Sequence, residues 1–412
     1  MPLIRPFTAL RPAPEYAQEV AAPPYDVLSS EEARVRAADK PWSFLHVSKP
    51  EIDLPPGADA YAAEVYAKGK ESFARMLTQG VLRRDPEPCY YLYRLAMGAH
   101  IQTGLVATVS VADYKGNRIR KHEFTRPDKE DDRVRHIDVL NAQTGPVFLT
   151  YRHSTEIDAL SAFIIEGPPD TDILLDDVRH SLWPIRERKL IAAFSQAFGK
   201  TDYFYIADGH HRSAAAARVA ENRLASNPDH TGEEAYNYFL AVIFPDNQTR
   251  ILDYNRVVRD LNGLSKKEFL SRLRQAFTVA PEDKPVKPGR AGEFGMYLAG
   301  QWYRLAIKRE RVPAADPVQR LDISLLQNNL LTPILAIADP RRDKRIDFVG
   351  GIRGLVELER RVNSSEMAAA FSLYPTTLAD LMAVADAGSV MPPKSTWFEP
   401  KLADGLISHV LD

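Results

Sequence analysis

The sequence contains a single cysteine, Cys89, among its 412 residues. One cysteine excludes an intramolecular disulfide, a thiolate metal cluster and a Cys-x-x-Cys redox pair. This cysteine usage fits a reducing compartment, and we therefore expect the protein in the cytoplasm.

Long apolar runs are equally absent. The first sixteen residues lack the apolar core of a signal peptide, and no later segment offers the run of about 20 apolar residues that a membrane helix needs. We expect no membrane partner. Glycine, with 21 residues, is rarer than proline, with 30, which indicates stiff and ordered connections.

An excess of charge of one sign is also missing. The chain has 53 Lys and Arg residues and 55 Asp and Glu residues, which gives a net charge of −2. This balance provides no electrostatic footprint for nucleic acid, so we expect no nucleic-acid partner. With 45% hydrophobic and 26% charged residues the composition is that of a globular protein, and the length predicts two or three compact units.

Three familiar nucleotide and metal motifs are missing. The glycine-rich stretch 350–354 lacks the lysine of a P-loop, and the sequence has neither a Gly-x-Gly-x-x-Gly fingerprint nor a His-Glu-x-x-His motif. His210 and His211 are adjacent, so on a helix their side chains diverge by about 100° and should not share one metal ion. A zinc hydrolase is therefore a minor alternative.

Hydrophobic periodicity predicts the order of the elements. We expect helices over 58–79, 210–224, 266–277, 314–337, 354–361 and 378–387, and strands over 89–97, 102–111, 146–151, 203–207, 236–244, 295–298, 302–307, 348–349 and 370–373. The charged segment 121–136 is expected to be a solvated helix. A stretch rich in Pro, Gly and Lys at 280–292 is typical of a linker, and a change of character near residue 260 predicts two units, 1–260 and 261–412.

The most distinctive local pattern is a strand, a turn and a helix start. Asp208 and Gly209 precede an alanine-rich helix whose first turn holds His210, His211 and Arg212. A helix N-terminus carries partial positive charge, so each cation there costs about 0.3–1 kcal/mol. An anionic ligand explains this cost, because backbone N–H groups, imidazoles and the guanidinium would converge on its oxygens. In the alternative, Asp208 only caps the helix and Arg212 reaches solvent.

The run Tyr-Ile-Ala-Asp-Gly-His-His-Arg at 205–212 resembles the Asp-Gly-x-His-Arg box of the ParB/sulfiredoxin-like superfamily, in which a strand–turn–helix element binds nucleotide phosphates. Across the whole chain the sequence is similar to the family called domain of unknown function 1015. The similarity lies in the 208–212 box and in Ala-Pro-Pro-Tyr-Asp-Val at 22–27, Lys-His-Glu-Phe-Thr at 121–125, Gly-Pro-Val-Phe-Leu at 145–149, Asp-Tyr-Asn-Arg-Val at 253–257 and Pro-Pro-Lys-Ser-Thr at 392–396.

The resemblance implies an α+β fold, with a ParB/sulfiredoxin-like mixed core over 1–260 and a second α/β unit at the C-terminal end. Sulfiredoxins need a cysteine beside the phosphate loop, where this chain has a histidine. Partition proteins of the ParB type carry a DNA reader and usually a basic surface, unlike this chain. The free serine kinase branch, which phosphorylates a free amino acid hydroxyl and uses a glutamate as base, fits best.

This branch implies a nucleotide-dependent phosphotransferase acting on a small hydroxyl metabolite, with free serine as first candidate and with ATP or ADP and Mg²⁺. Asp208 would orient the metal or the substrate, and His211 and Arg212 would hold phosphate oxygens. Glu123 would be the base. The further candidates for nucleotide binding are Gly209, His210, Lys394 and Ser395.

Several alternatives stay open at this level. Glu123 could be one more charge in a solvated segment, and Asp26, fixed after two prolines, is a second candidate base. The same anion site would also serve a phosphoserine or related phosphomonoester hydrolase, or a non-catalytic nucleotide-binding regulator. The sequence leaves open the nucleotide, the direction of transfer, the role of residues 261–412 and the oligomeric state.

Overall fold

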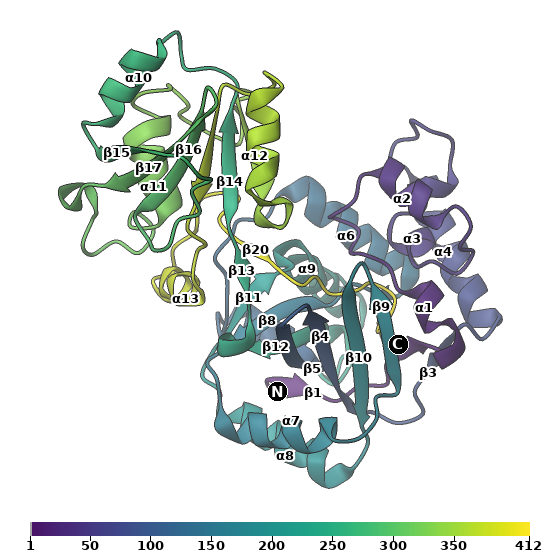
Figure 1. Ribbon diagram of the computed structural model, residues 1–412. Helices are drawn as coiled ribbons and strands as arrows, with labels where there is room; N and C mark the ends of the chain where they lie inside the picture. Colours follow the sequence, from purple (N-terminus) through teal and green to yellow (C-terminus); the bar gives the residue numbers. More distant parts are fainter. Residues whose placement is uncertain (1) are drawn as a thin grey trace. The chain divides into compact units, whose positions relative to one another are not determined.

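The computed structural model describes residues 2–412 and shows a mixed α/β protein with two compact units (Figure 1). Unit 1 is Met1–Thr249 with Pro400–Asp412, and unit 2 is Arg250–Glu399. The sequence predicted units 1–260 and 261–412, with the C-terminal tail in the second unit. The tail instead returns to unit 1, because it forms backbone bridges from Asp404 to Ala22 and from Ser408 to Leu10.

Unit 1 is built on a nine-stranded mixed sheet in the order β6-β11-β8-β12-β5-β4-β10-β9, with β1 beside β5. Its strands are β1 (Ile4–Arg5), β4 (Tyr90–Met97), β5 (His100–Ser110), β6 (Ile119–Arg120), β8 (Val147–Tyr151), β9 (Thr171–Leu175), β10 (Val178–Ile185), β11 (Phe204–Asp208) and β12 (Tyr238–Pro245). β4 and β5 confirm the strands predicted over 89–97 and 102–111, and they pair as an antiparallel hairpin. Two short pairs complete the unit: β2 (Leu10–Pro12) with β3 (Leu82–Arg84), and β7 (Ala142–Gln143) with β21 (His409–Val410).

The helices of unit 1 cover this sheet and add an N-terminal cluster. They are α1 (Ala17–Val20), α2 (Ser30–Ala37), α3 (Leu45–Ser48), α4 (Ala63–Thr78), α5 (Val111–Lys115), α6 (Pro127–Leu140), α7 (Thr155–Ile165), α8 (Arg188–Gly199) and α9 (His210–Ser226). The main core joins the sheet to phenylalanines of α8, such as Phe198, and to alanines of α9, such as Ala216. α4 begins later than predicted, because residues 59–62 form a turn in which the Asp59 carboxylate accepts a hydrogen bond from the Tyr61 N–H at 3.0 Å.

Unit 2 is built on an antiparallel sheet in the order β15-β17-β16-β19-β14-β18. Its strands and helices are β13 (Ile251–Leu252), β14 (Tyr254–Val258), α10 (Lys266–Leu273), β15 (Phe277–Glu282), β16 (Glu293–Leu298), β17 (Gln301–Ile307), α11 (Asp322–Leu326), β18 (Ile346–Gly350), α12 (Gly354–Asn363), β19 (Ala369–Leu373), α13 (Leu378–Asp386) and β20 (Trp397–Phe398). Neighbouring strand residues serve different cores: Met296 packs with α10 and α11, and Tyr297 packs with α12. Because successive side chains of a strand point to opposite faces, both faces of this sheet are buried.

Two predictions within unit 2 are wrong. The segment 314–337 is helical only over α11 and the π-helical turn Gln327–Leu331, because Pro317 and Pro333 interrupt the helical hydrogen bonds. The stretch 280–292 is no linker between units, since Val286 is buried in unit 2 and its carbonyl accepts a hydrogen bond from Ser372 Oγ at 2.6 Å.

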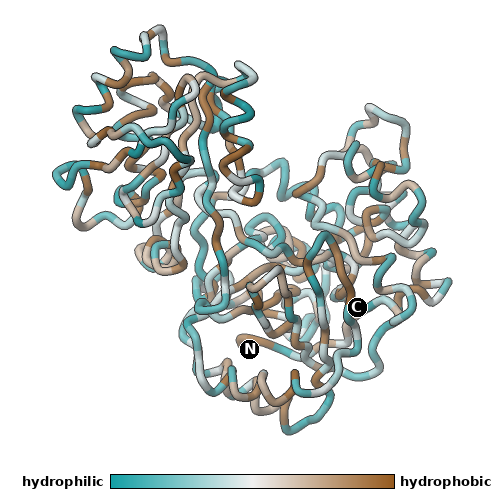
Figure 2. The backbone as a smooth tube through the Cα atoms, in the orientation of Figure 1, coloured by the Kyte–Doolittle hydropathy of each residue, from teal (hydrophilic) through white to brown (hydrophobic). Residues whose placement is uncertain are grey.

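The hydrophobic residues are distributed in short stretches over both units, as Figure 2 shows. Within residues 2–412 there is no helix with both the length and the apolar character needed to cross a membrane.

Candidate functional site

The turn between β11 and α9 carries the charged box found in the sequence. β11 is buried from Phe204 to Ala207 and pairs with β6 and β8, so the position of its carboxyl end is fixed. Gly209 follows with φ of +97°, a left-handed conformation that favours glycine. A Cβ at Gly209 would lie 3.0 Å from Nε of Arg212. The turn therefore requires glycine on both conformational and steric grounds.

The Arg212 guanidinium is buried beside this turn. Its Nη2 lies 3.6 Å from the Asp208 carboxylate, and its Nη1 donates a hydrogen bond to the Pro146 carbonyl. Nε is buried and finds no hydrogen-bond partner within residues 2–412. Burial opposes the charge, but the carboxylates of Asp208 and Asp26 outweigh it and raise the pKa of Arg212 above its ordinary value. Arg212 is therefore a permanent cation with one unused donor.

A cavity of about 30 Å³ lies against Arg212. Tyr25, Arg133, Gly145 and Asp404 contribute to its wall. The volume holds roughly two water molecules. The cavity therefore has room beside Arg212 for oxygens of a small anionic group.

The charged groups that line this cavity differ in how they are paired. Arg133 pairs with Asp132 at 2.8 Å, and its guanidinium lies 3.9 Å from the ring centre of Tyr25. The buried carboxyl of Asp404 accepts a hydrogen bond from the Tyr25 N–H at 3.3 Å. Burial raises the pKa of Asp404 to about 7, against the lowering effect of Arg212. Asp404 is therefore partly protonated near neutral pH and compensates little of the charge of Arg212.

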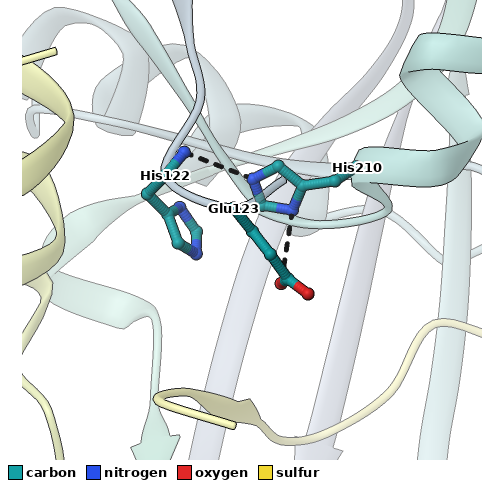
Figure 3. Close-up of side chains that lie close together, drawn as sticks. All are labelled: His122, Glu123 and His210. Carbon is teal, nitrogen blue, oxygen red and sulfur yellow. Dashed lines mark hydrogen bonds and ion pairs between the residues drawn. The ribbon is translucent and has the colours of Figure 1, made fainter. Parts of the chain in front are cut away.

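His210 points toward His122 and Glu123 (Figure 3). Its Nδ1 lies 3.9 Å from the Glu123 carboxylate, and its Nε2 accepts a hydrogen bond from the His122 N–H at 3.4 Å. Burial lowers the pKa of His122 to about 4, and burial together with His122 lowers the pKa of His210 well below its ordinary value. The group thus combines two neutral imidazoles with the half-exposed Glu123 carboxylate.

His211 faces the start of α6. Its Nε2 accepts a hydrogen bond from the Arg126 N–H at 3.0 Å, and burial lowers its pKa. His210, His211 and Arg212 therefore contact three separate groups of residues. Their side chains do not converge on one oxyanion as the sequence analysis expected, because successive residues of a helix point about 100° apart.

Asp208 connects the box to the C-terminal tail. Its Oδ2 lies 3.1 Å from Lys401 Nζ, and its Oδ1 faces Arg212. Burial opposes ionisation, but Lys401 and Arg212 hold the pKa of Asp208 well below its usual range. Asp208 is thus an ionised carboxylate already paired with two cations, which lowers its affinity for a metal ion.

Lys394 and Ser395 belong to unit 2. The Lys394 carbonyl accepts a hydrogen bond from Arg256 at 2.9 Å, and Ser395 Oγ donates to the Pro392 carbonyl. Burial lowers the pKa of Arg256 to about 9. The structure therefore pairs the Lys394 backbone with this buried guanidinium, and the Ser395 hydroxyl bonds within its own loop.

Four residues of the site were not predicted from the sequence. His122 is adjacent to Glu123 in the 121–125 motif, and that adjacency was the available signal. Arg133 was visible only as one of many charges in its segment. Lys401 and Asp404 gave no signal, because the tail that carries them meets Asp208 and Tyr25 only through the fold.

The fold and this site define a mixed α/β protein with a buried, cationic strand–turn–helix element. Residues 4–324 match the model of a family described as a protein of unknown function, DUF1015. The chain belongs to this family. A search of the curated proteins finds no match.

Several solved structures are similar to this chain at low sequence identity. A C-terminally truncated SbnI from Staphylococcus aureus has 11% identity and a TM-score of 0.38, with 73% of this chain and 85% of that chain covered. A conserved hypothetical protein from Pyrococcus furiosus has 14% identity and a TM-score of 0.34, with 73% and 93% covered. A free serine kinase in complex with AMP has 12% identity and a TM-score of 0.34, with 71% and 86% covered.

Proposed function

We propose that this chain is a nucleotide-dependent phosphotransferase that acts on a small hydroxyl metabolite, with free serine as the first substrate to test. The observation that carries the proposal is the buried Arg212 guanidinium, which lines a cavity and whose Nε has no partner in the described part of the chain. A permanent cation at a helix N-terminus is suited to phosphate oxygens. The resemblance of the 208–212 box to the free serine kinase branch selects the substrate class.

In this proposal the two groups of side chains have separate roles. Arg212 holds oxygens of the transferred phosphoryl group, since phosphoryl transfer depends mainly on positioning and charge neutralisation. Glu123 takes the proton of the substrate hydroxyl, whose oxygen bonds to phosphorus while the bond to the nucleotide's leaving oxygen breaks. His210 orients Glu123, and His211 fixes the start of α6 through its hydrogen bond with Arg126.

The cofactors of the proposal are ATP or ADP with Mg²⁺. Mg²⁺ prefers oxygen ligands and takes several of them from phosphates and water. Asp208 is the carboxylate beside Arg212 that fits this preference, but Lys401 and Arg212 already pair with it. We therefore propose that Mg²⁺ enters with the nucleotide. Unit 1 would be the ParB/sulfiredoxin-like core, with the terminal phosphoryl group alone reaching the cavity.

The test is an assay of the full chain with ATP or ADP, Mg²⁺ and L-serine, in which phosphoserine is measured by mass spectrometry. Glu123→Gln should lower the rate about 10²–10⁴-fold and leave nucleotide binding intact, because a general base acts on the proton and not on the nucleotide. His153→Gln, which changes another half-exposed histidine of unit 1, is the control and should keep full activity. Wild-type protein that neither binds nucleotide nor forms phosphoserine would contradict the proposal.

A phosphomonoester hydrolase is the second candidate. The observation that favours it is the half-exposed Glu123 carboxylate, which water can reach. This activity would release phosphate from phosphoserine without any nucleotide. Saturable nucleotide binding with no turnover of either kind would instead identify a regulator.

A further inference from the structure

We propose that His122, Glu123 and His210 form a binding site for one divalent transition-metal ion of the kind that favours imidazole nitrogen, such as Zn²⁺. One possible ligand atom from each residue lies within 4.8 Å of the other two (Figure 3). The site is separate from Asp208, and it does not depend on whether the chain transfers phosphate.

The types of ligand define the class of ion. Two imidazole nitrogens and one carboxylate oxygen are a common ligand set for Zn²⁺ and related transition metals. Mg²⁺ and Ca²⁺ prefer oxygen ligands throughout, so this group should discriminate against them. Three protein ligands leave coordination positions for water or for a substrate oxygen.

The ligand atoms lie slightly farther apart than they would around one ion, so the side chains must move closer together to bind it. Two ligands at about 2.1 Å from one tetrahedral ion lie about 3.4 Å apart. His210 Nδ1 and the Glu123 carboxylate are 3.9 Å apart, which is close to this spacing. Both imidazoles are buried, whereas the Glu123 side chain is 52% exposed. Glu123 is therefore the ligand through which an ion from solvent reaches the two buried imidazoles.

An unsatisfied side chain points independently to a ligand. His122 is only 2% exposed, and neither of its ring nitrogens makes a well-formed hydrogen bond among residues 2–412, although the Ile206 backbone lies close enough to influence its pKa. Buried polar atoms are nearly always satisfied in folded proteins, and an ion is one way to satisfy them. The rings of His122 and His210 meet edge to face with centroids 4.5 Å apart, so both are close enough to serve one ion.

One existing contact competes with the ion. His210 Nε2 accepts the His122 N–H, so Nδ1 carries the proton in the metal-free protein. An ion on Nδ1 requires the other neutral tautomer, so the single ring proton of His210 moves from Nδ1 to Nε2 and no net proton is released. The hydrogen bond that is lost is long, at 3.4 Å, and the new metal–nitrogen bond replaces it.

The experiment uses the full chain without a polyhistidine tag, stripped of metal with a chelator. Zn²⁺ is titrated in competition with a chromophoric chelator, and Co²⁺ is added separately to record its visible absorption. Wild type should take up one Zn²⁺ per chain, and Co²⁺ should show the bands of a site with nitrogen ligands. Millimolar Mg²⁺ should not displace either ion.

Two variants and one control make the outcome decisive. Glu123→Gln should weaken Zn²⁺ binding at least tenfold with an unchanged unfolding curve, because this side chain is half exposed. His122→Asn should weaken it similarly. His153→Gln removes a histidine that pairs with Asp158 at 2.8 Å, and it should leave binding unchanged. Equal Zn²⁺ affinity of wild type and Glu123→Gln would overturn the proposal.

The metal site and the proposed phosphotransferase can fail separately. Phosphoserine formation by chelator-treated protein, together with absent Zn²⁺ binding, would overturn the metal site and retain Glu123 as the base. Zn²⁺ binding without any phosphoserine would support the metal site and leave the phosphotransferase unsupported.

Discussion

At the scale of single residues, Gly209 and Arg212 depend on each other. The left-handed glycine lets β11 turn directly into α9, and the missing side chain leaves the space that the guanidinium fills. The buried charge is then stabilised by the carboxylate of Asp208, four residues earlier, and by Asp26 from a distant segment. The local chemistry of the box is therefore completed by tertiary contacts.

Gly209→Ala should destabilise the protein by about 1–3 kcal/mol, since alanine must adopt a left-handed φ and its Cβ would press on Arg212. Urea unfolding measures this change. Gly199→Ala at the end of α8 is the matched control, because a Cβ there meets no atom within 4 Å. Equal stability of the two variants would show that the turn is not strained by a side chain.

Asp404 predicts a pH dependence of stability. The pKa of this carboxyl is about 7 in the folded chain and near 3.8 in an unfolded one. The folded state therefore keeps a proton that the unfolded state loses, and the stabilisation present below about pH 4 is lost as the pH rises to 7. Between about pH 4 and 7, the free energy of unfolding of wild type, measured with urea, should fall on the order of 4 kcal/mol more than that of Asp404→Asn. If the free energies of unfolding of the two proteins changed in parallel with pH, the raised pKa of Asp404 would be contradicted.

At the scale of elements, local signals and distant contacts explain what the sequence could predict. The strand, turn and helix at 203–226 lie within one short segment, and their signals are local: apolar alternation for the strand, a glycine for the turn and a run of alanines for the helix. Their bounds were predicted nearly to the residue. Lys401 and Asp404 join the site across about two hundred residues or more of chain, and no local pattern records such a contact. The stretch 280–292 was misassigned for the same reason, since Val286 is fixed by Ser372 of a distant strand.

Gly295 tests this packing of the 280–292 stretch against the sheet of unit 2. A Cβ at Gly295 would overlap Ser372 Oγ and the Val286 carbonyl, so Gly295→Ala should displace the stretch and cost about 1–3 kcal/mol. Limited proteolysis should then cut within 283–292. Gly289→Ala lies in the same stretch with its Cβ no closer than 3.8 Å to a neighbour, and it should resist the protease like wild type. Unchanged proteolysis of both variants would contradict the packing.

At the scale of the whole molecule, unit 2 is an insertion between two parts of unit 1. The chain leaves unit 1 at Thr249 and returns at Pro400, and the Glu399 N–H donates to the Arg250 carbonyl at 3.3 Å. The two crossing points are therefore adjacent. The resemblance to a known box located the site within unit 1, but the composition change near residue 260 did not reveal the return of the tail.

Replacing residues 250–399 with a short Gly-Ser linker should leave unit 1 folded, because its two cut ends are neighbours. Circular dichroism should show a cooperative thermal transition. Deletion of residues 400–412 is the contrasting variant, and it should abolish that transition by removing Lys401, Asp404 and β21 from unit 1. A folded tail deletion would contradict the division into units.

The central claim is that Arg212, at the opening of α9, binds phosphate oxygens. Calorimetric titration of ADP with Mg²⁺ into the full chain tests it most directly, with Arg212→Lys as the variant and Arg218→Lys as the control. Arg218 lies farther along α9 and pairs with Asp131 at 2.8 Å on the surface. The account predicts one site per chain, at least tenfold weaker binding by Arg212→Lys, and wild-type binding by Arg218→Lys. Equal affinity of all three proteins, or no binding by wild type, would contradict it.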